Sequence, residues 1–258
     1  MTHEKVLIVN ADDYGLTPNI SRGIRESYNN GIVRSTSAMM NIKGVADELN
    51  KLLAESPGLG IGVHLNLTVG APFLPGKEVS TLVDQDGFFP KNAIIYQALP
   101  EMDPDQIHRE WRTQIEAMFD LGIKPDHLDS HHFVSYKSGI LQTIMLQLAT
   151  EFELPIRNVP EKPGMLTFPS VLAVKTPDRT ETGFFGDGVS QNLILEILSG
   201  LGIGTTELMT HPGFVDEDLL KLSKYNRQRH TELEILCSQA VKDQIDHLGI
   251  KLSNFSQL

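Results

Sequence analysis

A short apolar run near the N-terminus ends in two adjacent carboxylates, and this feature limits the folds open to the chain. Residues 6–9 are apolar and mostly β-branched, which is typical of a strand buried on both faces. Asp12 and Asp13 follow it, and Thr17 and Pro18 then open a predicted helix as N-cap and first helical residue. Because ligands bind at this edge of α/β sheets and barrels, the carboxylates are either site residues or turn formers that help to cap the helix.

Strands and helices alternate along the rest of the chain. Helices are predicted at 18–30, 45–55, 103–121, 139–152, 192–199 and 231–248, and strands at 34–40, 59–67, 154–157, 207–210 and in the stretch that ends near 131. Asp103, Pro104 and Gln106 predict a helix start with a capping box. Such alternation implies βαβ units, a mainly parallel sheet and right-handed crossovers, and therefore an α/β fold.

Two stretches rich in proline and glycine, 70–102 and 158–188, interrupt this alternation. The first contains several large apolar residues, so it is too apolar for a free linker. It is interpreted as a folded excursion beside the site, with a structural subdomain away from the site as the alternative. Since no repeat, low-complexity tract or interdomain linker is found, residues 1–258 are expected to form one domain with insertions near 70–102 and 158–188.

Composition excludes several classes of protein. The chain has 22 basic and 33 acidic residues and a net charge of −11, which argues against a nucleic-acid binder. The single Cys237 excludes an internal disulfide framework and a multi-cysteine metal site, and a small buried apolar role on a helix is expected for it. No apolar run is long enough to cross a bilayer, and no signal segment precedes the first strand. We therefore expect a soluble cytoplasmic protein without membrane or nucleic-acid partners, and leave a homodimer open.

Side chains that can bind metals or transfer protons gather at four predicted strand ends. They are Asp12 and Asp13, His64, His131 with His132, and His211. Two imidazoles and one carboxylate on one face can hold a metal ion and leave positions open for water and substrate. A lone histidine at a strand end is more often structural than a ligand. The coincidence of four such segments favours one shared site.

Four stretches of the sequence also resemble the motifs of a known family. NADDYGL at 10–16, GVHLNLT at 62–68, HLDSHH at 127–132 and HPGF at 211–214 resemble, in order and spacing, the motifs of the YdjC-like carbohydrate deacetylases. That family contains the chitooligosaccharide deacetylases. One departure is visible, because members often extend the third motif as a longer histidine-rich run, whereas Phe133 follows His132 here.

The resemblance implies a fold, a reaction and residue roles. The implied fold is a distorted (β/α) barrel with fewer than eight strands, similar to the polysaccharide deacetylases. The implied reaction is hydrolytic removal of an N-acetyl group from an amino sugar. By position, Asp13, His64 and His131 match the metal ligands. Asp12 matches the catalytic base and His211 the catalytic acid.

The metal and the remaining polar residues leave alternatives open. The resemblance implies one divalent ion, Mg²⁺, whereas two imidazoles suit Zn²⁺ or another transition metal better. The sequence does not decide which of Asp12 and Asp13 is the base and which the ligand. Arg157 is a candidate to orient Asp12, to hold a sugar substituent or to form a salt bridge within the barrel. His132 is a further candidate for substrate binding.

The expected substrate is a small N-acetylated sugar, most simply an N-acetylglucosamine disaccharide or its phosphate. The two long insertions could wall the mouth of the barrel, which suits a short ligand. Arg157, Lys162 and Arg179 are candidates to receive a phosphate. A metal-dependent sugar isomerase or epimerase and a non-catalytic sugar-binding protein are the alternatives. The paired aspartates and His211 favour the hydrolase, because proton abstraction from carbon would more naturally use a lysine or glutamate as the base.

Overall fold

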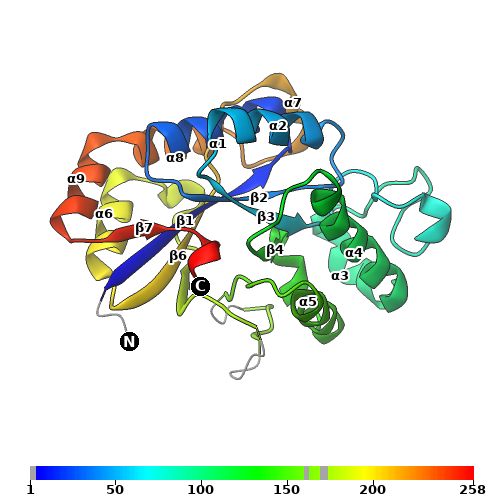
Figure 1. The fold of residues 1–258 in the computed structure, drawn as a ribbon. Coiled ribbons are helices and arrows are strands. Elements are labelled where there is room, and N and C mark those ends of the chain that lie inside the picture. Colours follow the sequence, from blue (N-terminus) through cyan, green and yellow to red (C-terminus); the bar gives the residue numbers. More distant parts are fainter. Residues whose placement is uncertain (1–3, 160–162, 169–173) are drawn as a thin grey trace.

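The computed structural model describes residues 4–159, 163–168 and 174–258, and this part of the chain forms an α/β fold around one parallel sheet (Figure 1). The strands are β1 (Lys5–Tyr14), β2 (Ser35–Ala38), β3 (Gly60–Leu65), β4 (Leu128–Ser130), β5 (Arg179–Glu181), β6 (Gly204–Thr210) and β7 (Lys251–Ser253). Six of them follow the order β4-β3-β2-β1-β6-β5, and β7 pairs with β1. The seven parallel strands of the described residues form an incomplete barrel, as expected for a barrel with fewer than eight strands.

Helices surround the strands on the outside. They are α1 (Pro18–Asn29), α2 (Val45–Glu55), α3 (Ile95–Ala98), α4 (Pro104–Asp120), α5 (Gly139–Glu151), α6 (Gln191–Gly200), α7 (Glu217–Leu222), α8 (Arg227–Cys237) and α9 (Gln239–His247). Figure 1 shows α1, α2 and α8 along one side, α6 and α9 at the β6 end, and α4 and α5 at the β4 end. None of the described helices combines the length and the apolar character needed to cross a membrane.

The central strand, β1, has neighbours from both ends of the chain. Along 5–11 it pairs with β6, along 6–8 with β7, and from residue 10 onward with β2. The register with β2 shifts between Ala11 and Tyr14, where Asp13 adopts a φ of 72°. Successive side chains of a regular strand point to opposite faces. The irregularity breaks this alternation, so Asp12 and Asp13 both reach the same cavity.

The edges of the sheet differ from the expectation. Residues 154–157 do not form a regular strand, although Ile156 makes an isolated parallel bridge to Leu128 of β4 and its N–H donates to the carbonyl of Lys175. These contacts extend the barrel beyond β4. Neither β5 nor β7 was predicted, because each contains only three residues and carries little periodicity.

Two helix boundaries also differ. The helix expected at 231–248 is divided into α8 and α9 at Ser238, whose hydroxyl accepts from the N–H of Val241 and so caps a new helix. Asp103 caps α4 as predicted, but the capping box does not form. The side-chain oxygen of Gln106 instead accepts from the N–H and hydroxyl of Thr81. Cys237, expected to be buried, is the last residue of α8 and is partly exposed.

The insertion at 70–102 is folded and packs against α4. Its short helices are η1 (Gly76–Glu78), η2 (Asn92–Ile94), α3 and η3 (Leu99–Glu101). The buried carboxylate of Glu110 in α4 accepts from the backbone N–H groups of Phe73 and Leu74. Asn92 from this insertion lines the cavity that contains the paired aspartates, so the excursion lies beside the site.

Candidate active site

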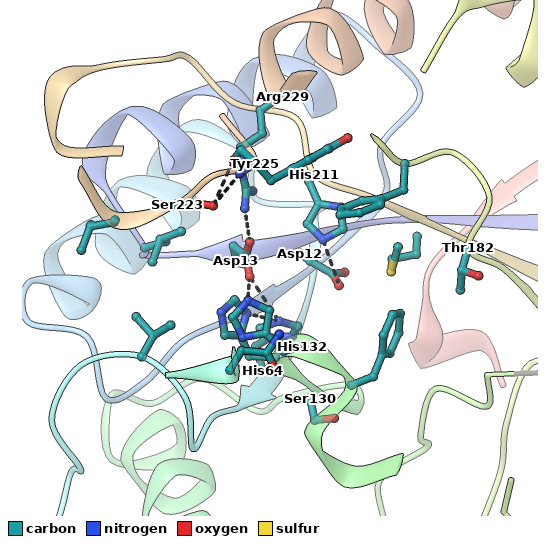
Figure 2. A pocket seen from close by; sticks show the side chains of 18 residues that line it. Asp12, Asp13, His64, Ser130, His132, Thr182, His211, Ser223, Tyr225 and Arg229 are labelled. Carbon is teal, nitrogen blue, oxygen red and sulfur yellow. Dashed lines mark hydrogen bonds and ion pairs between the residues drawn. The ribbon is translucent and has the colours of Figure 1, made fainter. Parts of the chain in front are cut away.

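The four strand ends singled out in the sequence meet at one cavity of about 360 Å³ (Figure 2). The polar residues that line it include Asp12, Asp13, His64, His131, His132 and His211. All of them lie at or just beyond the carboxyl ends of β1, β3, β4 and β6. This is the edge at which parallel barrels place their ligands.

Three of these side chains converge on one point. Asp13 Oδ1 lies 2.8 Å from His131 Nδ1 and 3.2 Å from His64 Nε2. Among the described residues, these two imidazoles are the partners of this buried oxygen, and neither contact has the geometry of a hydrogen bond. Burial alone would raise the pKa of Asp13, but His131 and Arg229 hold it well below its usual value, so the carboxylate is charged. A charged carboxylate oxygen close to two imidazole nitrogens, with no well-formed hydrogen bond of its own, fits a divalent metal ion.

The contacts behind this trio support the same interpretation. His64 Nδ1 lies 2.7 Å from Asp129 Oδ1, so the carboxylate fixes the ring and leaves Nε2 free to face Asp13. A histidine that ligates a metal is commonly held in this way by a carboxylate on its other nitrogen. Arg229 Nη2 donates to the second oxygen of Asp13 at 2.6 Å. Figure 2 shows Asp13 between Arg229 on one side and His64 on the other.

A second trio of possible ligands, Asp12, His64 and Asp129, is equally compact but is already engaged. Both oxygens of Asp12 accept from Arg157, at 2.6 and 2.8 Å. Asp129 is held by His64 through one oxygen and by Ser37 and Arg157 through the other. The trio that contains Asp13 therefore fits a cation better.

Arg157 lies behind the cavity and does not line it. Its side chain is 1% exposed and contacts the carboxylates of Asp12, Asp129 and Glu207. Burial alone would lower the pKa of Arg157, but these carboxylates raise it well above its usual value. The geometry corresponds to the expected role of orienting Asp12. It contradicts direct binding of a sugar substituent, because no face of the guanidinium is open to the cavity.

Arg179, a second candidate for binding a phosphate group, is also absent from the cavity. Arg179 is exposed at the first residue of β5, and its guanidinium lies near the carbonyl of Ile203, before β6 begins. That position is at the opposite end of the strands from the cavity. Lys162 lies outside the described residues.

His211 follows β6 and faces Asp12. Its Nε2 lies 3.9 Å from Asp12 Oδ2, and its backbone N–H donates to Glu232 at 2.5 Å. Burial lowers the pKa of His211 to about 4, so the imidazole is neutral near pH 7. His132 lies exposed beside His131, with its Nδ1 2.9 Å from the hydroxyl of Thr68.

Several functional side chains were not identified from the sequence. Asp129 stands two residues before His131, and this spacing on a strand could have placed both on one face. No local signal marks Arg229, which lies 216 residues from its partner Asp13. Glu232 is fully buried, and burial raises its pKa to about 8. Glu232 accepts hydrogen bonds from the N–H of His211 and from the hydroxyl of Tyr225, and these contacts exist only because the fold brings α8 beside the end of β6.

Solved structures show to which class the fold belongs. A peptidoglycan deacetylase from Bacillus subtilis superposes with a TM-score of 0.52 at 13% identity, over 98% of this chain and 89% of that one. At this identity the likeness concerns the fold alone. The fold is that of the polysaccharide deacetylases, an incomplete α/β barrel with its cavity at the carboxyl ends of the strands.

The sequence then gives the family. Residues 6–247 match the family described as YdjC-like protein, and the chain belongs to this family. A carbohydrate deacetylase from Thermoanaerobacter pseudethanolicus is 38% identical over 255 residues, covering 98% of this chain and 99% of its own. A crystal structure from Enterococcus faecalis, named as a candidate cellobiose-phosphate cleavage protein, has a TM-score of 0.90 at 34% identity and 98% coverage of both chains.

Proposed function

We propose that the protein is a metal-dependent hydrolase that removes an N-acetyl group from a small amino sugar. One observation carries the proposal: an oxygen of Asp13 and two imidazole nitrogens converge on one point, while the adjacent Asp12 is held apart by Arg157. Two neighbouring carboxylates with different partners can have different roles. The full-length relatives named carbohydrate deacetylases support the same reaction class.

Asp13, His64 and His131 are the residues that would hold the metal ion. When bound, a divalent ion supplies polarisation of the acetyl carbonyl and a lowered pKa of the attacking water. The family resemblance implies Mg²⁺. Two nitrogen donors and one oxygen donor match Zn²⁺, Co²⁺, Ni²⁺ or Mn²⁺ better, because Mg²⁺ prefers oxygen ligands.

Asp12 is the proposed general base. Arg157 fixes both of its oxygens from behind, and the carboxylate lines the cavity from the front. A carboxylate has about four lone-pair positions, so these bonds leave room to accept a proton from water. Arg157 and Asn10 thus set the direction in which Asp12 takes that proton.

His211 is the proposed acid for the departing amine. Because burial keeps the imidazole neutral, it can donate a proton only after it has received one. Asp12 Oδ2 lies 3.9 Å from the imidazole Nε2, so Asp12 can pass on to it the proton that it takes from water. We therefore propose that the proton taken from water reaches the amine through Asp12 and His211.

The proposed substrate is an N-acetylglucosamine disaccharide. The cavity volume of about 360 Å³ is at the lower end of the range for small-molecule sites. The name of the Enterococcus faecalis relative also points to a disaccharide, in phosphorylated form. Among the described residues the cavity has one arginine, Arg229, which is paired with Asp13, so the unphosphorylated sugar is favoured.

The isomerase or epimerase alternative lacks its base. Among the described residues, no lysine or glutamate side chain lines the cavity. The two carboxylates that line the cavity, Asp12 and Asp13, are already engaged with Arg157 and with the imidazoles. The structure offers no observation that favours this reaction over amide hydrolysis.

The test is acetate release from a panel of N-acetylated mono- and disaccharides. The protein is stripped with a chelator and refilled separately with Mg²⁺, Zn²⁺, Co²⁺ or Mn²⁺. We expect acetate and free amine in equal amounts, only after refilling, and no product from an Asp13→Asn variant. Unchanged turnover in the stripped protein, or no acetate from any sugar with any metal, contradicts the proposal.

A further inference from the structure

An exposed aromatic ring stands on the wall of the cavity. Phe185 lines the cavity, yet its side chain is 46% exposed. The ring stacks on Tyr225, with centroids 4.2 Å apart and an interplanar angle of 19°. Its centroid lies 5.3 Å from that of His211. One face of the phenyl ring is therefore covered by Tyr225, and the exposed remainder is beside the proposed acid.

The position of this ring is fixed by the chain around it. The hydroxyl of Tyr225 donates to the buried carboxylate of Glu232 and accepts from the N–H of Gly186. The carbonyl of Tyr225 accepts from Arg229 Nε at 3.0 Å. Gly186 has a φ of 78°, which suits glycine at the turn directly after Phe185. These bonds hold Tyr225, on which the Phe185 ring stacks, against α8 and, through Arg229, near Asp13.

The chemistry of such a ring suits a sugar. A pyranose presents an apolar face of C–H groups, and the negatively polarised face of an aromatic ring attracts the positive edges of C–H bonds. Burial of the exposed phenyl face against that surface adds a hydrophobic contribution. Since the ring lies at the cavity wall beside His211, it is placed to contact a sugar unit next to the one that loses acetate.

We propose that Phe185 is the stacking platform for the second sugar ring of the substrate, and that it gives the enzyme its preference for disaccharides over monosaccharides. This inference rests on the proposed function of the site. It adds a specificity-determining residue that takes no part in proton transfer or metal binding. Removal of the ring should therefore weaken binding of the longer substrate and leave the chemical step unchanged.

The first test is a comparison of two phenylalanine variants. Phe185→Ala should raise KM for an N-acetylated disaccharide roughly tenfold, as expected for loss of one stacked ring, with kcat unchanged. The kinetic constants for the monosaccharide should stay within about twofold. Phe185→Tyr should behave as wild type. Phe88→Ala is the matched control, because Phe88 is 51% exposed but does not line the cavity, and it should change neither substrate.

The second test measures binding without turnover. The only natural tryptophan, Trp111, is fully buried and does not line the cavity. In a double variant with Phe185→Trp and Asp12→Asn, the fluorescence of the introduced side chain would therefore report on ligand binding at the cavity wall. Its fluorescence should change on titration with the disaccharide, at a much lower concentration than with the monosaccharide. A Phe88→Trp variant in the same background should give no change.

The outcomes separate this inference from the proposed function. If wild-type protein releases acetate, but Phe185→Ala affects both sugars equally or Phe185→Trp does not respond to the disaccharide, the platform is refuted and the deacetylase remains. If wild-type protein releases no acetate, the fluorescence titration still decides whether Phe185 binds a sugar ring. A response to the disaccharide there supports the platform, and its absence overturns it.

Discussion

Asp12 and Asp13 are neighbours in the sequence, but their carboxylates contact different residues. Asp12 faces the fixed guanidinium of Arg157, and Asp13 faces two imidazoles and Arg229. The left-handed backbone of Asp13 makes this division, because it turns the second side chain away from the direction that the strand would impose. Such a conformation costs about 1–3 kcal/mol and persists where the surrounding structure requires it.

The division predicts different defects for two amide variants. Asp12→Asn keeps the shape of the side chain but removes the proton acceptor, so turnover should fall roughly 100- to 10,000-fold with little loss of metal binding. Asp13→Asn should instead lose metal affinity. Turnover and metal content, measured on the same preparations, check both results. Near wild-type turnover in Asp12→Asn would place the base elsewhere.

The sequence predicted those site residues that stand at strand ends, and missed those that reach the site from other elements. Asp12, His64 and His211 each follow an apolar run, so their position in the pattern marks them. Arg229 and Glu232 lie on a helix, and nothing in their local sequence distinguishes them from surface charges. Only the packing of α8 against the end of β6 gives them partners.

The segment that follows β6 packs closely against α1 and α8. A Cβ on Gly23 of α1 would lie 2.6 Å from the Cα of Gly213. The N–H of Gly213 donates to the carbonyl of Arg229 in α8, and the N–H of Phe214 donates to the carbonyl of Asn19 in α1. These contacts set the position of His211, two residues earlier.

A methyl group at position 23 should therefore disturb the site as well as the packing. Gly23→Ala forces backbone to move, so we expect a loss of about 1–3 kcal/mol of stability, a Tm lower by several degrees, and reduced turnover. Gly139→Ala is the matched control, since no heavy atom lies within 4 Å of its added Cβ, and it should be neutral or slightly stabilising. Thermal unfolding and kinetics measure both. Equal behaviour of the two variants would mean that the α1 contact does not position His211.

The long periodic helices were predicted within a few residues, whereas the short pairings were not. The helices α1, α4 and α5 have N-cap side chains, and α1, α2 and α4 have apolar periodicity, and both signals act within each segment. The three-residue strands β5 and β7 exist because neighbouring strands offer them hydrogen bonds. A pairing of this kind depends on residues far away in the chain, so the local sequence does not predict it.

The three proposed metal ligands come from separate strands of the sheet. Asp13 ends β1, His64 belongs to β3 and His131 follows β4. An ion bound by all three would connect segments more than fifty residues apart in the chain. Its binding energy would therefore add to the stability of the entire barrel.

Metal removal should accordingly lower the melting temperature. An ion at 100 times its Kd contributes about 2.7 kcal/mol, which corresponds to a Tm higher by about 5–10 °C for a domain of this size. Scanning calorimetry with and without a chelator measures the shift. The shift should persist in Asp12→Asn and disappear in Asp13→Asn. An equal shift in Asp13→Asn would show that the ion binds elsewhere.

The placement of β1 at the centre of the sheet has a consequence for synthesis on the ribosome. The hydroxyl of Thr210 in β6 donates to the carbonyl of Asn10, its partner 200 residues earlier in the chain. At a translation rate of about 5–20 residues per second, the first strand waits roughly 10–40 s for this neighbour. During that time the apolar side chains of β1 are not fully covered. The backbone N–H and C=O groups on its β6 side also have no partner, and such an open strand edge can pair wrongly with another chain. The strand that carries both aspartates therefore completes its pairing only after most of the chain has been synthesised.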